Sequence, residues 1–345
     1  MTTVDKDVVI VGAGMGAMAT AARLAKKGYC VRVFEASDRH GGKCRTEWID
    51  GYAFDTGPSL LTLPAVYRDL FQRTGDVLGR VVEMTPVDPS FDYRFHDGTS
   101  VKFANLSRKK TLEAIRTSYG VDAAVEWDQI MRRAEAMWDV SREPFIESEL
   151  KSPLSLLKRR HILRDLRIIA PRATLRDFGL SNPYLAKIMD RYATYSGSDP
   201  RKAPAVLSTI AFIEEAFGAW HIKGGIGTLS THIAERCEKV GVKIHLNSPV
   251  ARINLKGNKA VGVTLQNGAV VDADIVISNA DASFTYNTLI RENRRTVKKV
   301  RKEQSKLEPS LAGFSLLLGL RPSESPQLAH HTILFPDDYD AEFDA

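Results

Sequence analysis

The chain has 345 residues, 43% of them hydrophobic and 26% charged, which allows a buried core and favours about two domains. The net charge is +6. The sequence shows no transit peptide and no apolar run of the ~20 residues needed to span a bilayer. Its three cysteines lack CxxC spacing and its histidines form no HExxH-type set, so we expect reduced thiols and no metal site.

The first expected element is a short β-branched run, Val8 to Val11, which predicts a central parallel strand buried on both faces. A glycine-rich turn follows it. Gly12 allows the tight turn, and Gly14 lets backbone amides come close to a pyrophosphate. Gly16 belongs to the same cofactor-binding turn. Ala17 stands where a third glycine would allow close helix-to-strand packing, a place in which alanine is accepted.

A helix is predicted from about Met15 to Lys27, with its positive N-terminal end toward the phosphates. The second strand is predicted from Tyr29 to Phe34, and Cys30 on it is expected to be a small buried hydrophobe. Glu35 ends this strand. It follows Gly14 at the spacing at which an acid accepts hydrogen bonds from a ribose hydroxyl. Strand, turn, helix and acid together predict dinucleotide binding.

A second glycine pair directly after the acid indicates which dinucleotide to expect. Simple nicotinamide enzymes need no such pair, whereas bare backbone with two cations suits a pyrophosphate or a flavin edge, so we expect FAD. Further on, a strand from Gly51 runs into a turn at Gly57 and Pro58, which leaves no side chain to block a flat ring. The glycine pair and its cations are Gly41, Gly42, Lys43 and Arg45.

These segments and four later ones resemble the FAD-dependent amine oxidase superfamily, and within it the bacterial-type phytoene desaturases. The resemblance implies an α/β fold in which a Rossmann-like FAD-binding domain is interleaved with an α+β substrate domain. It also implies that the backbone at Val250 meets the adenine. The later segments are 191–205, 218–229, 242–247 and 274–281.

The resemblance further implies hydride transfer from an allylic carbon to flavin N5, with loss of a proton from the neighbouring carbon. The partner would be a hydrophobic isoprenoid substrate that is selected by the shape of a tunnel. The sequence indicates no particular catalytic residue. Desaturases of this type continue further and end with a glycine-rich segment. The chain is therefore expected to be truncated at the C-terminus, with an incomplete pocket and little desaturation by itself. Two alternatives stay open: a flavin oxidoreductase of another substrate class, or a non-catalytic remnant.

The chain is expected to pass between the two domains more than once. A β-hairpin is predicted from Phe91 to Phe103, turned at Asp97-Gly98. It should place Tyr93 and Phe95 opposite Val101 and Phe103. An apolar strand is predicted from Leu311 to Leu320. The expected FAD-binding segments are 1–65 and 220–290, and the expected substrate-domain segments are 66–219 and 291–345.

Positive charge is concentrated in a predicted helix from Leu154 to Ile169, with leucines and isoleucines on one side and Lys and Arg around the rest. Two interpretations stay open: peripheral contact with an anionic membrane, or a solvated helix that packs on the core. Nucleic acid is not expected as a partner, because the segment lacks interleaved aromatic residues. A second basic run, Arg291 to Lys306, predicts a solvated helix. We expect a cytoplasmic location, at the inner face of the membrane in the first interpretation, and make no prediction of oligomeric state.

Overall fold

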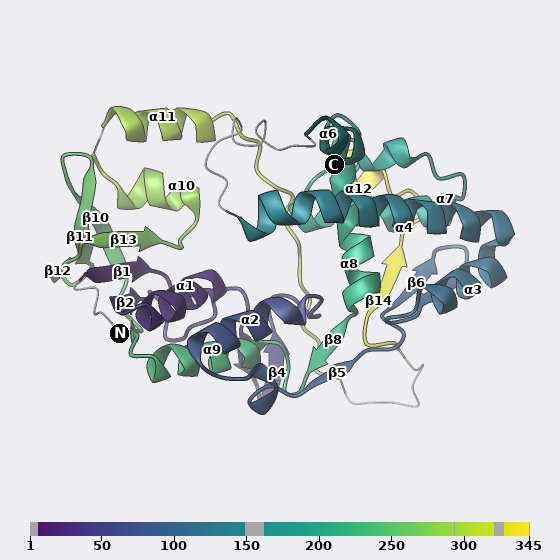
Figure 1. Ribbon diagram of the computed structural model, residues 1–345. Coiled ribbons are helices and arrows are strands. Elements are labelled where there is room, and N and C mark those ends of the chain that lie inside the picture. Colours follow the sequence, from purple (N-terminus) through teal and green to yellow (C-terminus); the bar gives the residue numbers. More distant parts are fainter. Residues whose placement is uncertain (1–5, 149–161, 293, 321–327, 345) are drawn as a thin grey trace. The chain divides into compact units, whose positions relative to one another are not determined.

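The computed structural model describes residues 6–148, 162–292, 294–320 and 328–344 (Figure 1). The chain forms two compact units, each built from separate stretches of sequence. The chain passes from one unit to the other near residues 85, 220, 309, 314 and 319, whereas the sequence predicts crossings near 65, 219 and 290. The first unit comprises Met1–Thr85, His221–Pro309 and Ser315–Gly319; the second comprises Pro86–Trp220, Ser310–Phe314 and Leu320–Ala345.

A four-stranded parallel sheet forms the centre of the first unit, in the order β13-β1-β2-β9. Strand β1 lies between two neighbouring strands and its residues Val8–Val11 are buried, as its β-branched sequence predicts for a central strand. Helix α1 packs against this sheet and against α9 (Figure 1). The bounds are β1 (Asp7–Val11), α1 (Met15–Lys26), β2 (Cys30–Phe34), α9 (Gly227–Lys239), β9 (Lys243–His245) and β13 (Ile275–Ser278).

The buried role expected for Cys30 is wrong. Cys30 is the first residue of β2 and is exposed, because it lies at the open end of the strand. Burial begins at the next residue, Val31.

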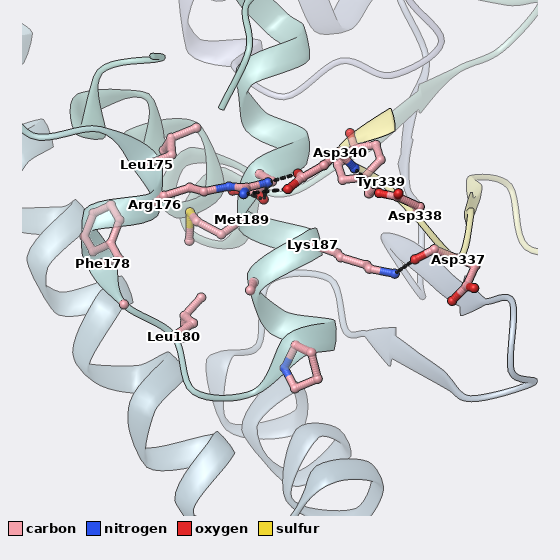
Figure 2. Close-up of a pocket in the computed structure, with 14 residues that line it drawn as sticks. Leu175, Arg176, Phe178, Leu180, Lys187, Met189, Asp337, Asp338, Tyr339 and Asp340 are labelled. Atoms are coloured by element: carbon pink, nitrogen blue, oxygen red, sulfur yellow. Dashed lines mark hydrogen bonds and ion pairs between the residues drawn. The ribbon is translucent and has the colours of Figure 1, made fainter. Parts of the chain in front are cut away.

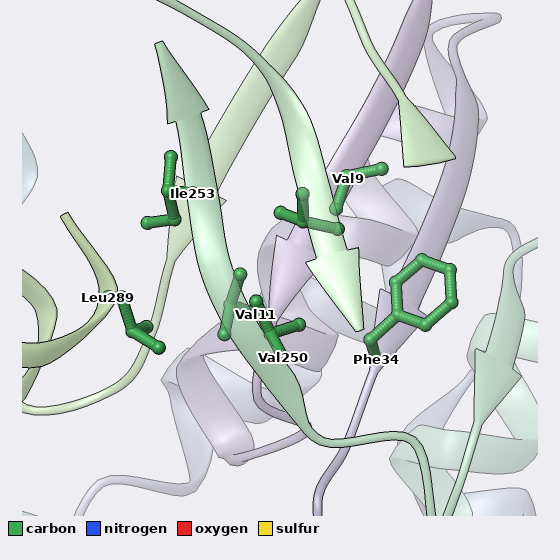
Figure 3. Close-up of a cluster of buried hydrophobic side chains, with 7 residues drawn as sticks. Val9, Val11, Phe34, Val250, Ile253 and Leu289 are labelled. Carbon is green, nitrogen blue, oxygen red and sulfur yellow. The ribbon is translucent and has the colours of Figure 1, made fainter. Parts of the chain in front are cut away.

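An antiparallel ladder of β10 (Val250–Lys256), β11 (Lys259–Leu265) and β12 (Val270–Asp272) packs beside the parallel sheet. Apolar side chains of both sheets and of the chain after β13 meet in one buried cluster (Figure 3). This cluster fixes the start of β10 beside the end of β1. Its members are Val9, Val11, Phe34, Val250, Ile253, Val263 and Leu289.

Shorter elements complete the first unit. The hairpin β3–β4 is antiparallel, and α11 confirms the helix predicted in the second basic run. The strands β5 and β8 lie at the crossings near residues 85 and 220. The bounds are β3 (Thr46–Ile49), β4 (Tyr52–Asp55), α2 (Pro64–Thr74), β5 (Met84–Pro86), β8 (Trp220–Ile222), α10 (Ala282–Phe284) and α11 (Arg295–Gln304).

The second unit contains the predicted hairpin, as β6 (Phe91–Phe95) and β7 (Ser100–Phe103). Tyr93 lies opposite Val101 as predicted, but Phe103 pairs with Phe91 and not with Phe95. A third strand, β14, pairs in parallel with β6. The remaining bounds are α3 (Arg108–Tyr119), α4 (Val121–Arg142), α6 (Ile162–Ile169), α7 (Pro183–Asp190), α8 (Thr209–Phe217), β14 (Thr332–Phe335) and α12 (Ala341–Asp344).

The apolar strand predicted from Leu311 to Leu320 is wrong. This segment has no regular secondary structure, and its side chains are exposed, with Phe314 at 91%. Apolar residues form a strand only when a neighbouring strand takes up their backbone hydrogen bonds. In the described part of the chain, one such bond is seen, from the Leu311 N–H to the Gly197 carbonyl at 2.9 Å.

The predicted basic helix is described only in its last turns, as α6, and its residues 154–161 lie outside the described part. Among the described residues, no helix is both long enough and apolar enough to cross a membrane.

Candidate cofactor site

A cavity of about 710 Å³ lies in the first unit, where β1 gives way to α1. Its volume falls within the range of ligand sites. Eight of the twelve residues predicted to bind the cofactor line it. They include the glycines of both predicted turns, which are far apart in the sequence. These eight are Gly12, Gly14, Glu35, Gly41, Gly42, Lys43, Pro58 and Val250.

The two glycine groups meet along their backbones at this cavity. Gly12 has φ +88° and Gly41 has φ +100°, conformations that favour glycine. Gly14 and Gly41 form a parallel bridge, and the Gly41 N–H donates to the Ala13 carbonyl at 2.9 Å. A Cβ placed on Gly42 would lie 3.2 Å from the Gly14 Cα. The absence of side chains therefore leaves a bare cradle, which suits the close approach of a pyrophosphate.

The N-terminal end of α1 is free to bind an anion. Its N-cap is Gly14, no side chain caps it, and its first turn holds no acidic residue. In contrast, the Asp55 carboxylate accepts the N–H groups of Ile226 and Gly227 at the start of α9, at 2.7 and 3.1 Å. Unpaired N–H groups and the helix dipole favour a phosphate at the uncapped end.

The Glu35 carboxylate lies at the end of β2 and is held by the protein itself. Oε2 accepts the Ala13 N–H at 2.7 Å, and Oε1 accepts the N–H and the hydroxyl of Ser37, both at 2.9 Å. A carboxylate has about four acceptor positions, so roughly one remains, on Oε2. The carboxylate thus fixes the glycine turn and can still accept a ribose hydroxyl.

Four predicted cofactor residues do not line the cavity. Ala17 is buried, in keeping with its expected packing role, and Gly16 lies one position before it in α1. Arg45 pairs with Glu47 at 2.7 Å. A Cβ on Gly57 would lie 1.9 Å from the Lys43 carbonyl oxygen, so this glycine permits a close backbone approach.

One wall of the cavity consists of residues that the sequence did not predict to bind the cofactor. It is formed by the residues that follow β13, together with residues near β10 and β11. In the sequence, the segment 274–281 is marked only by its resemblance to the phytoene desaturases. The rule that ligands bind beyond the carboxyl ends of parallel strands could have found it. The missed residues include Pro249, Gln266, Asn279, Ala280, Asp281 and Phe284.

The buried thiols stay protonated. Burial raises the pKa of Cys44 to about 11, and burial raises the pKa of Cys237 to about 12. A thiolate is the reactive form of cysteine, so neither is poised for redox chemistry at neutral pH. Within the described residues, no group of three His, Cys, Asp or Glu side chains is placed to hold a metal ion.

A second cavity, of about 360 Å³, lies in the second unit beside α7 (Figure 2). Its cations are already paired: Arg176 binds Asp190 at 2.9 Å and also Asp340. The Lys187 ammonium donates to the carbonyls of Pro336 and Asp337, at 3.1 and 2.6 Å. These bonds tie the segment after β14 to α7, so the polar groups serve the fold.

The second unit also buries an ion pair, Arg191 with Glu214 at 3.0 Å. The two residues are 8% and 3% exposed. Glu214 also accepts the hydroxyls of Tyr192 and Tyr195, and the guanidinium lies 4.8 Å from the Phe91 ring centroid. Desolvated charges of this kind stabilise a fold only when their partners are in place.

Residues 18–306 match the family model described as flavin containing amine oxidoreductase. The chain belongs to this family. The expected mixed α/β fold is confirmed by the structure, and membership of this family supports FAD as the cofactor. At 30% identity it resembles a zeta-carotene-forming phytoene desaturase of Myxococcus xanthus, over 99% of this chain and 65% of that protein.

The chain is equally similar, at 30% identity, to a 4,4'-diapolycopene oxygenase of Methylomonas sp, over 99% of this chain and 68% of that one. It thus spans about two thirds of the length of these curated relatives. A solved oxidoreductase from Methanosarcina mazei shares the fold, with a TM-score of 0.60 at 18% identity, over 88% of this chain and 66% of that one.

Proposed function

We propose that the protein is an FAD-dependent desaturase of a carotenoid precursor such as phytoene. The main support for this proposal is the cavity in which two glycine turns meet the uncapped end of α1 beside Glu35. Similarity to a phytoene desaturase supports the substrate class. The twelve predicted cofactor residues belong to this proposal.

Bound FAD would supply the hydride acceptor for an allylic C–H bond, and a neighbouring carbon would release a proton to form the new double bond. The chain's part is to bind and orient the cofactor. Backbone amides of the cradle and of α1 would take the pyrophosphate, and Glu35 would take the ribose. Val250, held in the apolar cluster at the start of β10, would place its backbone at the adenine.

The first test is cofactor retention. The purified chain should carry a yellow flavin that is released on denaturation and identified as FAD by its mass. A colourless protein that binds NADH tightly would overturn the proposal.

The second test is the product formed in a phytoene-producing bacterium. More conjugated double bonds with no added oxygen would assign desaturation. An oxygenated carotenoid would instead assign the alternative of a flavin oxidoreductase of another class, here an oxygenase, which similarity to the Methylomonas protein supports. The weak turnover expected of this chain by itself stays a prediction, and the product yield measures it.

We also propose peripheral contact with an anionic membrane through α6, at the inner face of the cytoplasmic membrane. Leu163 is 82% exposed and Leu166 is 42% exposed, next to the cations Arg164 and Arg167. Apolar side chains flanked by cations suit the headgroup region. Replacing both leucines with Ser should reduce flotation with anionic vesicles, whereas Val270→Ser, at a 63% exposed strand residue, should not. Equal flotation of the parent and the leucine variant would refute this contact.

A further inference from the structure

Asn279 is the first residue after β13, and the backbone fixes it beside the glycine turn. Its N–H donates to the Val11 carbonyl at 2.9 Å. A Cβ placed on Gly12 would lie 3.8 Å from the Asn279 carbonyl carbon. This residue therefore cannot move away from the turn without breaking the pairing of β1 with β13.

The side chain of Asn279 fills the space that the glycines leave open. A Cβ on Gly14 would lie 2.8 Å from Nδ2, and a Cβ on Gly16 would lie 3.1 Å from Oδ1. The carboxamide thus covers the first turn of α1 and lines the cofactor cavity. Gly16, which does not line the cavity, has its explanation here: it makes room for an amide that does.

Within the described residues, no hydrogen bond to protein uses the Asn279 carboxamide, and the residue is exposed, so its N–H groups are open to a ligand in the cavity. The neighbouring acid behaves differently, because the Asp281 carboxylate accepts the Ser283 N–H at 2.7 Å. Asp281 also faces Lys43, which helps to keep the pKa of this carboxyl low, although its bonds to Ser283 contribute more. The Asn279 amide is therefore a neutral donor on this wall, beside the first turn of α1.

Given the proposed FAD site, we propose that Asn279 is a cofactor-binding residue whose amide donates a hydrogen bond to a pyrophosphate oxygen. The uncapped end of α1 draws the phosphates to this place, and the amide lies beside it. A donor there complements a phosphate, whereas an acid at the same position would repel it. The neutral amide thus favours the anionic ligand in a way that its isosteric acid could not.

The test measures the dissociation constant of FAD for the full chain stripped of flavin, by quenching of flavin fluorescence. Asn279→Ala removes the donor and should weaken binding about tenfold or more, as for other hydrogen bonds to charged groups. Asn279→Asp keeps the shape and should weaken binding about a hundredfold or more. Asn258→Asp in the β10–β11 turn makes the same charge change away from the cavity, and its affinity should stay within about twofold of the parent.

A role in folding alone would change the unfolding temperature of the flavin-free protein and leave affinity intact. We expect the affinity to fall and the unfolding temperature of the flavin-free protein to stay the same. The affinity for ADP should fall as much as that for FAD, because both molecules carry the two linked phosphates. Gly16→Ala should weaken binding in the parent and weaken it less in the Asn279→Ala background, where the crowded Oδ1 is gone. If the parent binds FAD and both Asn279 variants bind it equally well, this inference falls and the FAD site stands. A parent that binds no FAD removes the proposed function itself.

Discussion

At the scale of single residues, Glu35 shows how one carboxylate can serve both the fold and a ligand. Its bonds to Ala13 and Ser37 hold the glycine turn against the end of β2. The cofactor would then bind a cradle that is already shaped, which limits the loss of conformational freedom on binding.

We predict that Glu35→Gln weakens FAD binding at least tenfold and lowers the unfolding temperature of the flavin-free protein. The amide keeps the shape, but it loses the charge and turns a donor toward the N–H of Ala13 or of Ser37. Hydrogen bonds to charged groups contribute about 1.5–3 kcal/mol. Flavin titration and thermal unfolding measure the two effects. Ser37→Ala removes a hydroxyl that bonds both Glu35 and the Arg39 carbonyl but leaves the carboxylate charge in place, so it should change affinity far less. Full FAD affinity in Glu35→Gln would show that the acid does not bind the ribose.

His331 gives a pH dependence at the same scale. Burial, helped by the Arg191 cation, lowers its pKa from 6.5 to about 4. Between these values the unfolded chain binds more protons than the folded chain, so stability falls as the pH drops from about 6.5 toward 4. The full stability is present above pH 6.5.

We predict that His331→Phe makes the unfolding temperature less sensitive to pH within this window. The ring lies 5.0 Å from the Phe91 ring, so Phe can retain the contact while it removes the titrating group. Thermal unfolding of both proteins at a series of pH values measures the difference. Parallel curves from pH 6.5 to 4 would contradict the assignment.

At the scale of elements, the pair of Arg191 and Glu214 joins the end of α7 to α8. We predict that Glu214→Gln lowers the free energy of unfolding by about 3–5 kcal/mol, because it leaves the guanidinium buried without its counter-charge. Urea unfolding measures the change. The matched control is Glu83→Gln, in a pair with Lys223 whose side chains are 63% and 75% exposed. It should cost less than about 1 kcal/mol, and similar losses from both variants would contradict the structural role of the buried pair.

Local patterns predicted the elements of the cofactor unit well. The order of β1, α1 and β2 follows from a β-branched run, a glycine turn and an acid within 35 residues. The hairpin β6–β7 was found for the same reason, because its turn is local. The pairing of β14 with β6 could not be predicted in this way, because no local pattern indicates which of two distant strands become neighbours. In the apolar run 311–320, the local pattern predicted a strand that does not form. Its composition favours a strand, but the described residues provide no neighbouring strand.

The wall formed after β13 was missed for a related reason. Asn279 has an unremarkable place in the sequence, and its importance comes from the crossover that brings it to the end of β1. Predicting it required the strand order as well as the strands.

At the scale of the whole molecule, all residues that line the cofactor cavity belong to the first unit. The chain leaves this unit near β5 and re-enters it near β8, where the Lys223 N–H donates to the Glu83 carbonyl at 3.1 Å. The two ends of the intervening stretch are therefore close together.

We predict that residues 1–84 joined to 222–309 through a short Gly-Ser linker fold and bind FAD within about tenfold of the full chain's affinity. The linker replaces a connection whose ends already meet, so closing it has a small entropic cost. Calorimetry and flavin titration measure folding and binding, and the same protein with Glu35→Gln is the control. A parent that binds FAD, with a joined protein that shows no cooperative unfolding, would contradict this prediction.

The parallel pairing of β6 with β14 also has a consequence during synthesis on the ribosome. Thr332 lies opposite Asp92, so on the order of 240 residues must be translated after β6 before its partner exists, which takes about 12–48 s at 5–20 residues per second. Throughout that interval one edge of β6 has no strand beside it, and an unpaired edge is a template for pairing with other chains. The nascent protein thus has a long window in which chaperones are expected to bind it, and slower translation should lengthen that window.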